Sequence, residues 1–237
     1  VADGALIYNL NLSISATSPK LVVNNYAAFA ITNNGEINSC SVLGNVTVAQ
    51  SSRTTVFIGG IAVTNNGSII NCINNANIIS DVNSLGVSTA VGGIAYNNLG
   101  TISYSSFTGK AQANKLGGIT YFNRNLITKC YVTGELIAAT PEGYTSVLYL
   151  GGITAINTDN GSTSYGQIEF CYVINDGDTN KAKITNNYTA QTSYVGGIIG
   201  TNSVTNASAI RNSYIIFAFE NAVAGAHTSI GMVAGFS

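Results

Sequence analysis

Short apolar runs separated by Gly and Asn recur along the whole chain, and no window keeps the 3.6-residue period of an amphipathic helix. The runs are rich in Val, Ile, Tyr and Thr, which favour strands. A representative copy, 59–72, reads Gly-Gly-Ile-Ala-Val-Thr-Asn-Asn-Gly-Ser-Ile-Ile-Asn-Cys. The pattern predicts an all-β chain in which each copy carries two or three short strands.

The copies align on a pair of glycines or their substitutes. The pairs begin at Ala27, Gly59, Gly92, Gly117, Gly151, Gly196 and Gly231. The shortest spacing, from Gly92 to Gly117, is 25 residues, which suits one coil of a β-solenoid with strands about 4.8 Å apart. Longer spacings predict surface loops, where binding specificity is expected. These loops are 48–56, 79–90, 137–148, 158–166, 176–194 and 203–209. We therefore expect a single domain over residues 1–237, a parallel β-helix (β-solenoid) of about six to seven coils.

A column of asparagines lies six residues after the first glycine of each pair. Its members are Asn33, Asn65, Asn98, Asn123, Asn157 and Asn202. Asparagine tolerates the left-handed backbone conformation of bends, and stacked amides can hydrogen-bond to the coils above and below. We interpret the column as a structural ladder, with a sugar-binding ladder as the alternative.

An aliphatic column further along each copy is expected to fill the interior of the coils. Its members are Ile7, Ile37, Ile69, Ile102, Ile127, Ile168 and Ile210. Three residues after these positions comes a column with Cys40, Cys72, Cys130 and Cys171, whose other members are Leu and Ser. This composition favours a core column of small residues with free thiols. Disulfides between neighbouring coils are the alternative, since stacked Cα atoms about 5 Å apart lie within disulfide range.

The composition agrees with stacking. Of the 237 residues 46% are hydrophobic but only 8% are charged, and a charge repeated in register would repel its own copy at a cost of about 1 kcal/mol. The net charge of −1 without a basic run disfavours nucleic acid as a partner. The apolar runs are too short for a membrane helix, so no membrane insertion is expected in this segment.

Cofactors and metals are not expected, apart from one calcium candidate. Asp176, Asp178 and Asn180 place oxygen ligands at alternate positions. The bidentate Glu that completes a calcium loop is missing downstream, so an ordinary turn is the competing interpretation. The only histidine is His227, which disfavours a zinc site or a metalloprotease motif.

The repeat resembles the GLUG repeat of bacterial surface and secreted proteins. The resemblance rests on the motif Gly-Gly-Ile-Ala-x-x-Asn-x-Gly-x-Ile-x-x-Cys, with Gly44, Gly109 and Gly134 four residues beyond the Cys or Ser column. It implies a right-handed parallel β-helix on or outside the cell, as in large adhesins, and it supplies no catalytic residue. Departures occur at Ala27-Ala28 and Gly231-Met232.

The leading functional hypothesis is a non-enzymatic, extracellular structural or adhesive β-helix, a surface stalk or adhesin segment whose partner is a protein or glycan at a cell surface or matrix. The chain begins with the second half of a repeat and ends with the glycine half. It is therefore expected to be a segment of a longer repeat protein. The alternative is a filament subunit that stacks head to tail through its end coils.

A carbohydrate-active β-helix enzyme is a second alternative, which needs paired carboxylates on adjacent coils. Glu36 and Glu169 both adjoin the aliphatic column, but four coils apart. Ice binding is a further alternative, although Phe122 and Ile156 interrupt a partial column of threonines.

Overall fold

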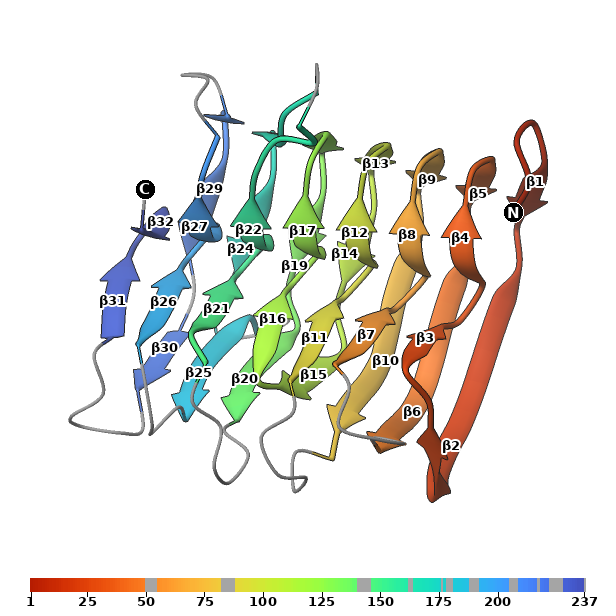
Figure 1. Ribbon diagram of the computed structural model, residues 1–237, viewed down its shortest axis with the longest axis horizontal. Helices are drawn as coiled ribbons and strands as arrows, with labels where there is room; N and C mark the ends of the chain where they lie inside the picture. The colour runs from red at the N-terminus through yellow and green to blue at the C-terminus, as the bar shows by residue number, and fades with distance from the viewer. Residues whose placement is uncertain are drawn as a thin grey trace.

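The structure is a computed structural model in which every regular element is a strand within the residues it describes (Figure 1). These residues are 1–49, 55–81, 88–139, 146–161, 164–175, 177, 181–187, 192–204, 209–216, 218–221 and 228–236. The strands form four sheets within these ranges, and all pairings between them are parallel apart from two isolated bridges. The chain is therefore all-β, as the sequence predicts.

We call the sheets A to D in the order in which the chain visits them. Sheet A contains β1 (Leu6–Tyr8), β5 (Glu36–Asn38), β9 (Ser68–Ile70), β13 (Thr101–Ser103), β18 (Leu126–Thr128), β23 (Gln167–Glu169) and β28 (Ile210–Arg211). Sheet B contains β2 (Asn11–Val22), β6 (Ser41–Ala49), β10 (Ile73–Ser80), β14 (Ser106–Phe107), β15 (Lys110–Ala113), β19 (Tyr131–Val132), β20 (Glu135–Ala139), β24 (Tyr172–Ile174), β25 (Lys183–Asn187), β29 (Tyr214–Ile216) and β30 (Ala218–Asn221).

Sheets C and D follow in the same way. Sheet C contains β3 (Asn25–Ala27), β7 (Val56–Gly59), β11 (Thr89–Gly92), β16 (Lys115–Gly117), β21 (Leu148–Gly151), β26 (Ser193–Gly196) and β31 (Thr228–Gly231). Sheet D contains β4 (Ala30–Asn33), β8 (Ala62–Asn65), β12 (Ala95–Asn98), β17 (Thr120–Asn123), β22 (Thr154–Asn157), β27 (Ile199–Asn202) and β32 (Ala234–Phe236).

One passage through sheets A, B, C and D is called a coil below. Each strand pairs with its equivalents in the preceding and following coils, so that Ile37 lies between Ile7 and Ile69. Figure 1 shows the coils side by side from the N-terminal to the C-terminal end. This arrangement is compatible with a β-solenoid. The expectation of two or three strands per copy is wrong, because each copy contributes to four sheets.

The inward columns form one continuous apolar core between the four sheets. Ile37, Ile69, Ile102, Ile127 and Ile168 are all fully buried. Each touches its own equivalent in the next coil, so one residue type satisfies every copy. The periodicity of the sequence is thus a direct consequence of strand pairing in register.

The paired glycines form the corner between sheets C and D. Strands of sheet C from β7 onward end on the first glycine of the pair. A Cβ atom on Gly92 would lie 1.8 Å from the carbonyl oxygen of Ala95, and one on Gly93 would lie 2.1 Å from that of Gly118. Neither contact is sterically allowed, so the corner requires glycine for close approach of the backbone.

A second corner, between sheets A and B, uses left-handed backbone conformations. The residue before each Cys or Ser position has φ between 48° and 55°. These residues are Asn9, Ser39, Asn71, Tyr104, Lys129, Phe170 and Asn212. The expectation that the asparagine ladder adopts this conformation is therefore wrong: its members are the last residues of the sheet D strands.

Candidate binding face on sheet B

The outward face of sheet B carries a groove that runs across four neighbouring coils. Its cavity volume is about 490 Å³. We call it the sheet B groove, and it is lined by Leu43, Gly44, Asn45, Asn75, Asn77, Thr108, Gly109, Lys110, Thr133, Gly134, Glu135 and Lys181. In β6, inward Val42 and Val46 are buried while Leu43 and Asn45 are exposed, so the alternation of a strand presents the groove residues to solvent.

Glycines form the floor of the groove. A Cβ atom on Gly109 would lie 2.1 Å from the carbonyl oxygen of Ala76, and one on Gly134 would lie 2.1 Å from that of Gly109. Gly44, with φ of 104°, is equally close to Ile14. Because the backbones approach this closely, no side chain fits at these three positions. The equivalent position in the coil of β10 is Ala76, whose small side chain is buried in the core.

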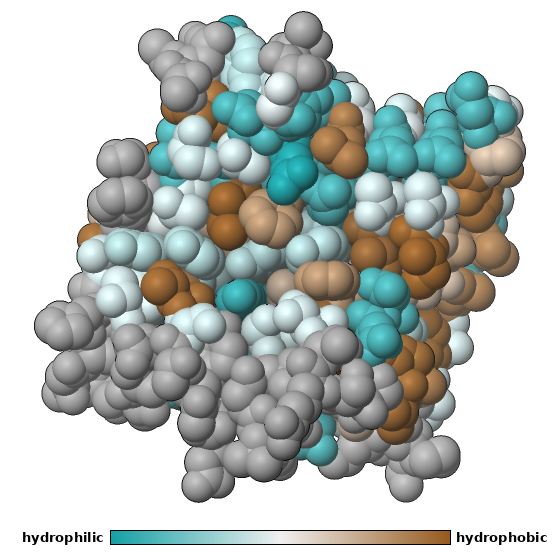
Figure 2. Space-filling model, viewed as in Figure 1, coloured by the Kyte–Doolittle hydropathy of each residue, from teal (hydrophilic) through white to brown (hydrophobic). Residues whose placement is uncertain are grey.

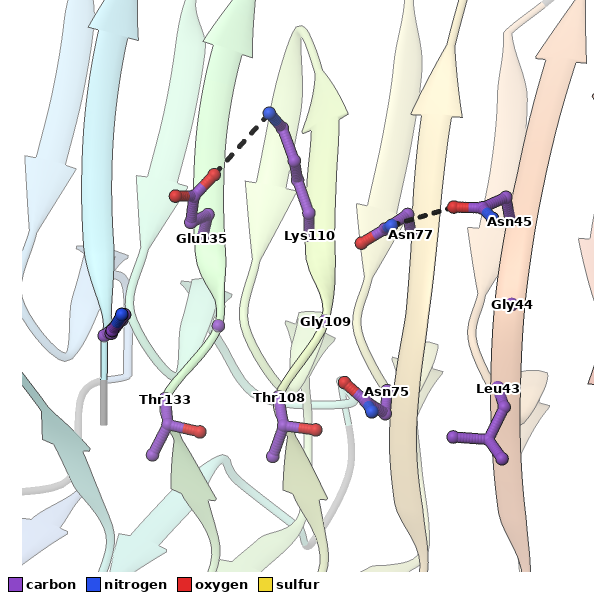
Figure 3. A pocket seen from close by; sticks show the side chains of 12 residues that line it. Leu43, Gly44, Asn45, Asn75, Asn77, Thr108, Gly109, Lys110, Thr133 and Glu135 are labelled. Atoms are coloured by element: carbon purple, nitrogen blue, oxygen red, sulfur yellow. Dashed lines mark hydrogen bonds and ion pairs between the residues drawn. The ribbon is translucent and has the colours of Figure 1, made fainter. Parts of the chain in front are cut away.

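Two rows of side chains, polar apart from Leu43, form the walls (Figure 3). One row contains Leu43, Asn75, Thr108 and Thr133, and the other contains Asn45, Asn77, Lys110 and Glu135. In the second row Asn77 Nδ2 donates to Asn45 Oδ1 at 2.8 Å, and Lys110 Nζ lies 3.5 Å from Glu135 Oε2. The ion pair is half exposed, so it neutralises local charge and contributes little to stability.

A row of stacked tyrosines lies beside the groove on the same outward face. Tyr131 precedes Thr133 by two residues, and its ring stacks on Tyr172 with a centroid distance of 5.2 Å. Tyr172 stacks in turn on Tyr214 at 5.3 Å. Partial burial and then the neighbouring rings Tyr131 and Tyr214 raise the pKa of Tyr172. The Tyr172 hydroxyl therefore stays protonated and can donate a hydrogen bond at neutral pH.

The predicted ladder asparagines line up along the edge of sheet D as a chain of side-chain hydrogen bonds. Nδ2 of each residue donates to Oδ1 of the next at 2.8 to 3.0 Å, from Asn33 through to Asn202. Asn33, Asn65, Asn98, Asn123 and Asn157 are completely buried. This burial leaves their amides inaccessible to a sugar. At the start of the row, buried Asn33 Oδ1 has no partner among the described residues.

The four cysteines are buried free thiols in the structure. Their column is more than an apolar slot, because each Sγ–H donates to the carbonyl oxygen two residues earlier, as Cys72 does to Ile70 at 3.2 Å. Ser105 occupies the same position and donates to Ser103 at 2.9 Å. Both Cys and Ser therefore suit this column, because either side chain can donate a hydrogen bond across the left-handed corner. Burial raises the pKa of Cys72 to about 12.

The remaining candidates from the sequence are the possible calcium ligands and the two glutamates beside the aliphatic column. Asp176, Asp178 and Asn180 fall outside the described residues. Within the described ranges no three His, Cys, Asp or Glu side chains gather as metal ligands. Glu36 accepts a hydrogen bond from Asn38 at 2.7 Å, and Glu169 lies 3.7 Å from Arg211 Nε. The described residues contain no helix that could cross a membrane.

The groove was missed at the sequence level because its wall residues differ from copy to copy. The column of Gly44, Gly109 and Gly134, with Ala76 at the equivalent place in the coil of β10, marks the position between the two wall rows where neighbouring backbones approach closely. The residues on either side of those glycines then form the walls.

Comparison with known proteins finds no match among family models, curated proteins or solved structures. The resemblance to the GLUG repeat therefore stays a prediction.

Proposed function

We propose that this chain is a non-enzymatic extracellular β-helix, right-handed and of about six to seven coils, that acts as a surface stalk or adhesin segment. The observation that carries the proposal is the uninterrupted stack of equivalent strands in four parallel sheets. Its buried columns hold the coils together, and its outer faces are left for contact. The resemblance to GLUG repeats supports the extracellular location and the handedness.

The adhesive surface in this proposal is the outward face of sheet B. Its groove and tyrosine row offer amide, hydroxyl and aromatic groups on strands held rigidly by pairing on both sides. Rigid presentation lowers the entropy lost on binding. A protein or glycan at a cell surface or in an extracellular matrix is the partner.

Adhesion of beads coated with the purified chain tests the proposal. Coated beads are expected to bind cultured cells or matrix more strongly than beads coated with the heat-denatured chain, and electron microscopy is expected to show short rods. Equal binding by both kinds of bead would contradict the adhesive role. Cleavage of a polysaccharide or protein by the purified chain would contradict the non-enzymatic role.

A filament subunit is the second candidate, favoured by apolar side chains at both ends of the stack. Figure 2 shows a large apolar area toward the N-terminal end. The exposed apolar residues of the first coil are Leu6, Tyr8, Leu10, Val22 and Ile31, and those of the last are Tyr214, Ile216, Ile230, Met232 and Val233. These surfaces adjoin strand edges that a further coil could pair with.

The stacking differs in detail from the expectation of two half coils that complete each other. Both end coils contain strands of all four sheets. A docking copy must also displace Val1, whose amino group donates to Thr32 O at 2.7 Å. Electron microscopy at high protein concentration decides this candidate, since monodisperse single rods are incompatible with a filament.

A further inference from the structure

The sheet B groove has the shape of a channel parallel to the stack axis. Its floor is made by Gly44, Gly109 and Gly134, and its walls repeat at every strand, about 4.8 Å apart. A ligand that follows the channel therefore meets equivalent polar positions at a regular spacing. Such a ligand is a linear polymer rather than a compact molecule.

The wall chemistry matches hydroxyl groups. Asn45, Asn75 and Asn77 each carry an amide with donor hydrogens and an acceptor oxygen, of which one Asn77 hydrogen is donated to Asn45 Oδ1. Thr108 and Thr133 each offer a hydroxyl that can both donate and accept. A polymer of sugars presents hydroxyls that also donate and accept, so every contact can be satisfied in either direction. Apolar surface is limited to the exposed side chain of Leu43 and the bare glycine backbone.

The charges in the groove favour an uncharged ligand. Lys110 and Glu135 pair with each other at 3.5 Å, and Lys181 is the other charged residue among the described ones that line the groove. A strongly anionic polymer would meet the carboxylate of Glu135. It would find too few cations to compensate for desolvation.

The backbone geometry disfavours an extended peptide. A peptide usually binds a sheet by adding a strand to an open edge. The groove instead crosses strands inside sheet B: β6 pairs with β2 and β10, and β20 pairs with β15 and β25. Their backbone groups are already engaged, so recognition must come from side chains.

We infer that the sheet B groove binds a linear, uncharged oligosaccharide whose chain runs along the stack axis. The inference rests on the proposed adhesive function and names its ligand class. The amides and hydroxyls of the walls bind the sugar hydroxyls, and the adjoining ring of Tyr131 extends the contact surface beyond the groove.

Isothermal titration calorimetry of the whole chain tests this, with hexasaccharides of β-1,4-linked glucose, xylose and mannose as probes. At least one is expected to bind at concentrations of about 1 mM or below. The double variant Asn75→Ala/Thr108→Ala is expected to weaken that binding at least tenfold. Thr133→Val, which replaces the hydroxyl with a methyl group of similar size, is expected to weaken it severalfold with little change in packing.

The matched control is Thr64→Ala/Asn66→Ala, which removes the same residue types from sheet D and the corner after it. It is expected to leave affinity within about twofold, which is less than 0.5 kcal/mol. Circular dichroism confirms that each variant is folded. Absence of binding by all three sugars, equal binding by the groove variants, or preferential binding of an extended peptide would overturn the inference.

The bead assay separates this inference from the proposed function. If beads carrying the groove variants adhere as well as wild type, the chain is adhesive through another surface and only the groove assignment fails. If the hexasaccharide binds in the groove but coated beads do not adhere, the adhesive role fails and the groove assignment stands.

Discussion

Removing one asparagine from the middle of the ladder should cost more stability than removing the first one. Asn98 accepts a hydrogen bond from Asn65 at 2.9 Å and donates to Asn123 Oδ1 at 3.0 Å and to Leu126 O at 3.3 Å. Asn98→Ala loses all three bonds, at about 1 kcal/mol each, and leaves the buried Asn123 Oδ1 without a donor, at about 1–3 kcal/mol. The expected loss is therefore about 4–6 kcal/mol.

Asn33 differs because its Oδ1 is buried and already without a partner among the described residues. Asn33→Ala loses the donations to Asn65 Oδ1 at 2.8 Å and to Ser68 O at 3.1 Å, and it leaves Asn65 Oδ1 unpaired. It also removes one unsatisfied acceptor, which offsets about 1–3 kcal/mol. The cost of Asn33→Ala should be at least about 2 kcal/mol lower than that of Asn98→Ala.

Urea denaturation measures the total change in the free energy of unfolding, and thiol labelling of the cysteines shows which coils are destabilised. Local readout is needed because stacked repeats can unfold in parts. Labelling of Cys72, in the same coil as Asn98, should accelerate more in Asn98→Ala than labelling of the distant Cys171. Asn66→Ala, whose amide donates to Asn34 at 2.7 Å on the surface, is the control and should change stability by under about 0.5 kcal/mol.

Equal costs for Asn33→Ala and Asn98→Ala would refute this reasoning. So would a loss below about 1 kcal/mol for Asn98→Ala, because it would mean that the buried amides contribute no more than surface ones.

Three further changes test the corners and the core. Phe170→Gly should raise stability by up to about 1 kcal/mol in thermal unfolding, because it relieves a left-handed φ of 53° on a half-exposed side chain; a lower melting temperature would contradict this. Gly93→Ala should destabilise by about 3 kcal/mol or more in urea, whereas Gly161→Ala, with open space around its Cβ position, should cost about 1 kcal/mol; similar costs would argue against the backbone clash. The pKa of Cys72, raised to about 12, means that the native state holds its proton above the unfolded thiol pKa, so stability falls as pH rises from about 9 toward 12. Cys72→Ser should flatten this fall in the urea midpoint, and an unchanged pH profile would count against the buried thiol as its cause.

The inward columns could be predicted from the sequence because each member packs against its own copy. Ile37 pairs with Ile69, and Asn65 with Asn98, so the same residue type recurs at equivalent positions of successive coils. The corners were harder to predict. Seven residues share the left-handed backbone conformation, but their side chains range from Asn71 to Phe170. Their common feature is that each directly precedes the column that contains the cysteines. Four sheets therefore arise where the apolar pattern predicted two or three strands.

The wall rows of the groove could not be predicted in the same way, because their residue types differ from copy to copy. The row that contains Leu43 continues as Asn75, Thr108 and Thr133, so one wall carries three different types of side chain. A side chain that points into solvent needs to fit only its ligand or water, whereas an inward one must fit its neighbour in the next coil.

The sheet B groove combines these two kinds of position. The floor of the groove is constrained by coil packing, since Gly109 and Gly134 each lie against the backbone of the preceding coil and accept no side chain. The wall residues are less constrained, since Asn75 on β10 and Thr108, between β14 and β15, are not part of the buried core. Wall substitutions should therefore alter ligand preference at little cost in stability, while floor substitutions disrupt the stack itself. A scaffold of this kind can change what it binds without changing how it folds.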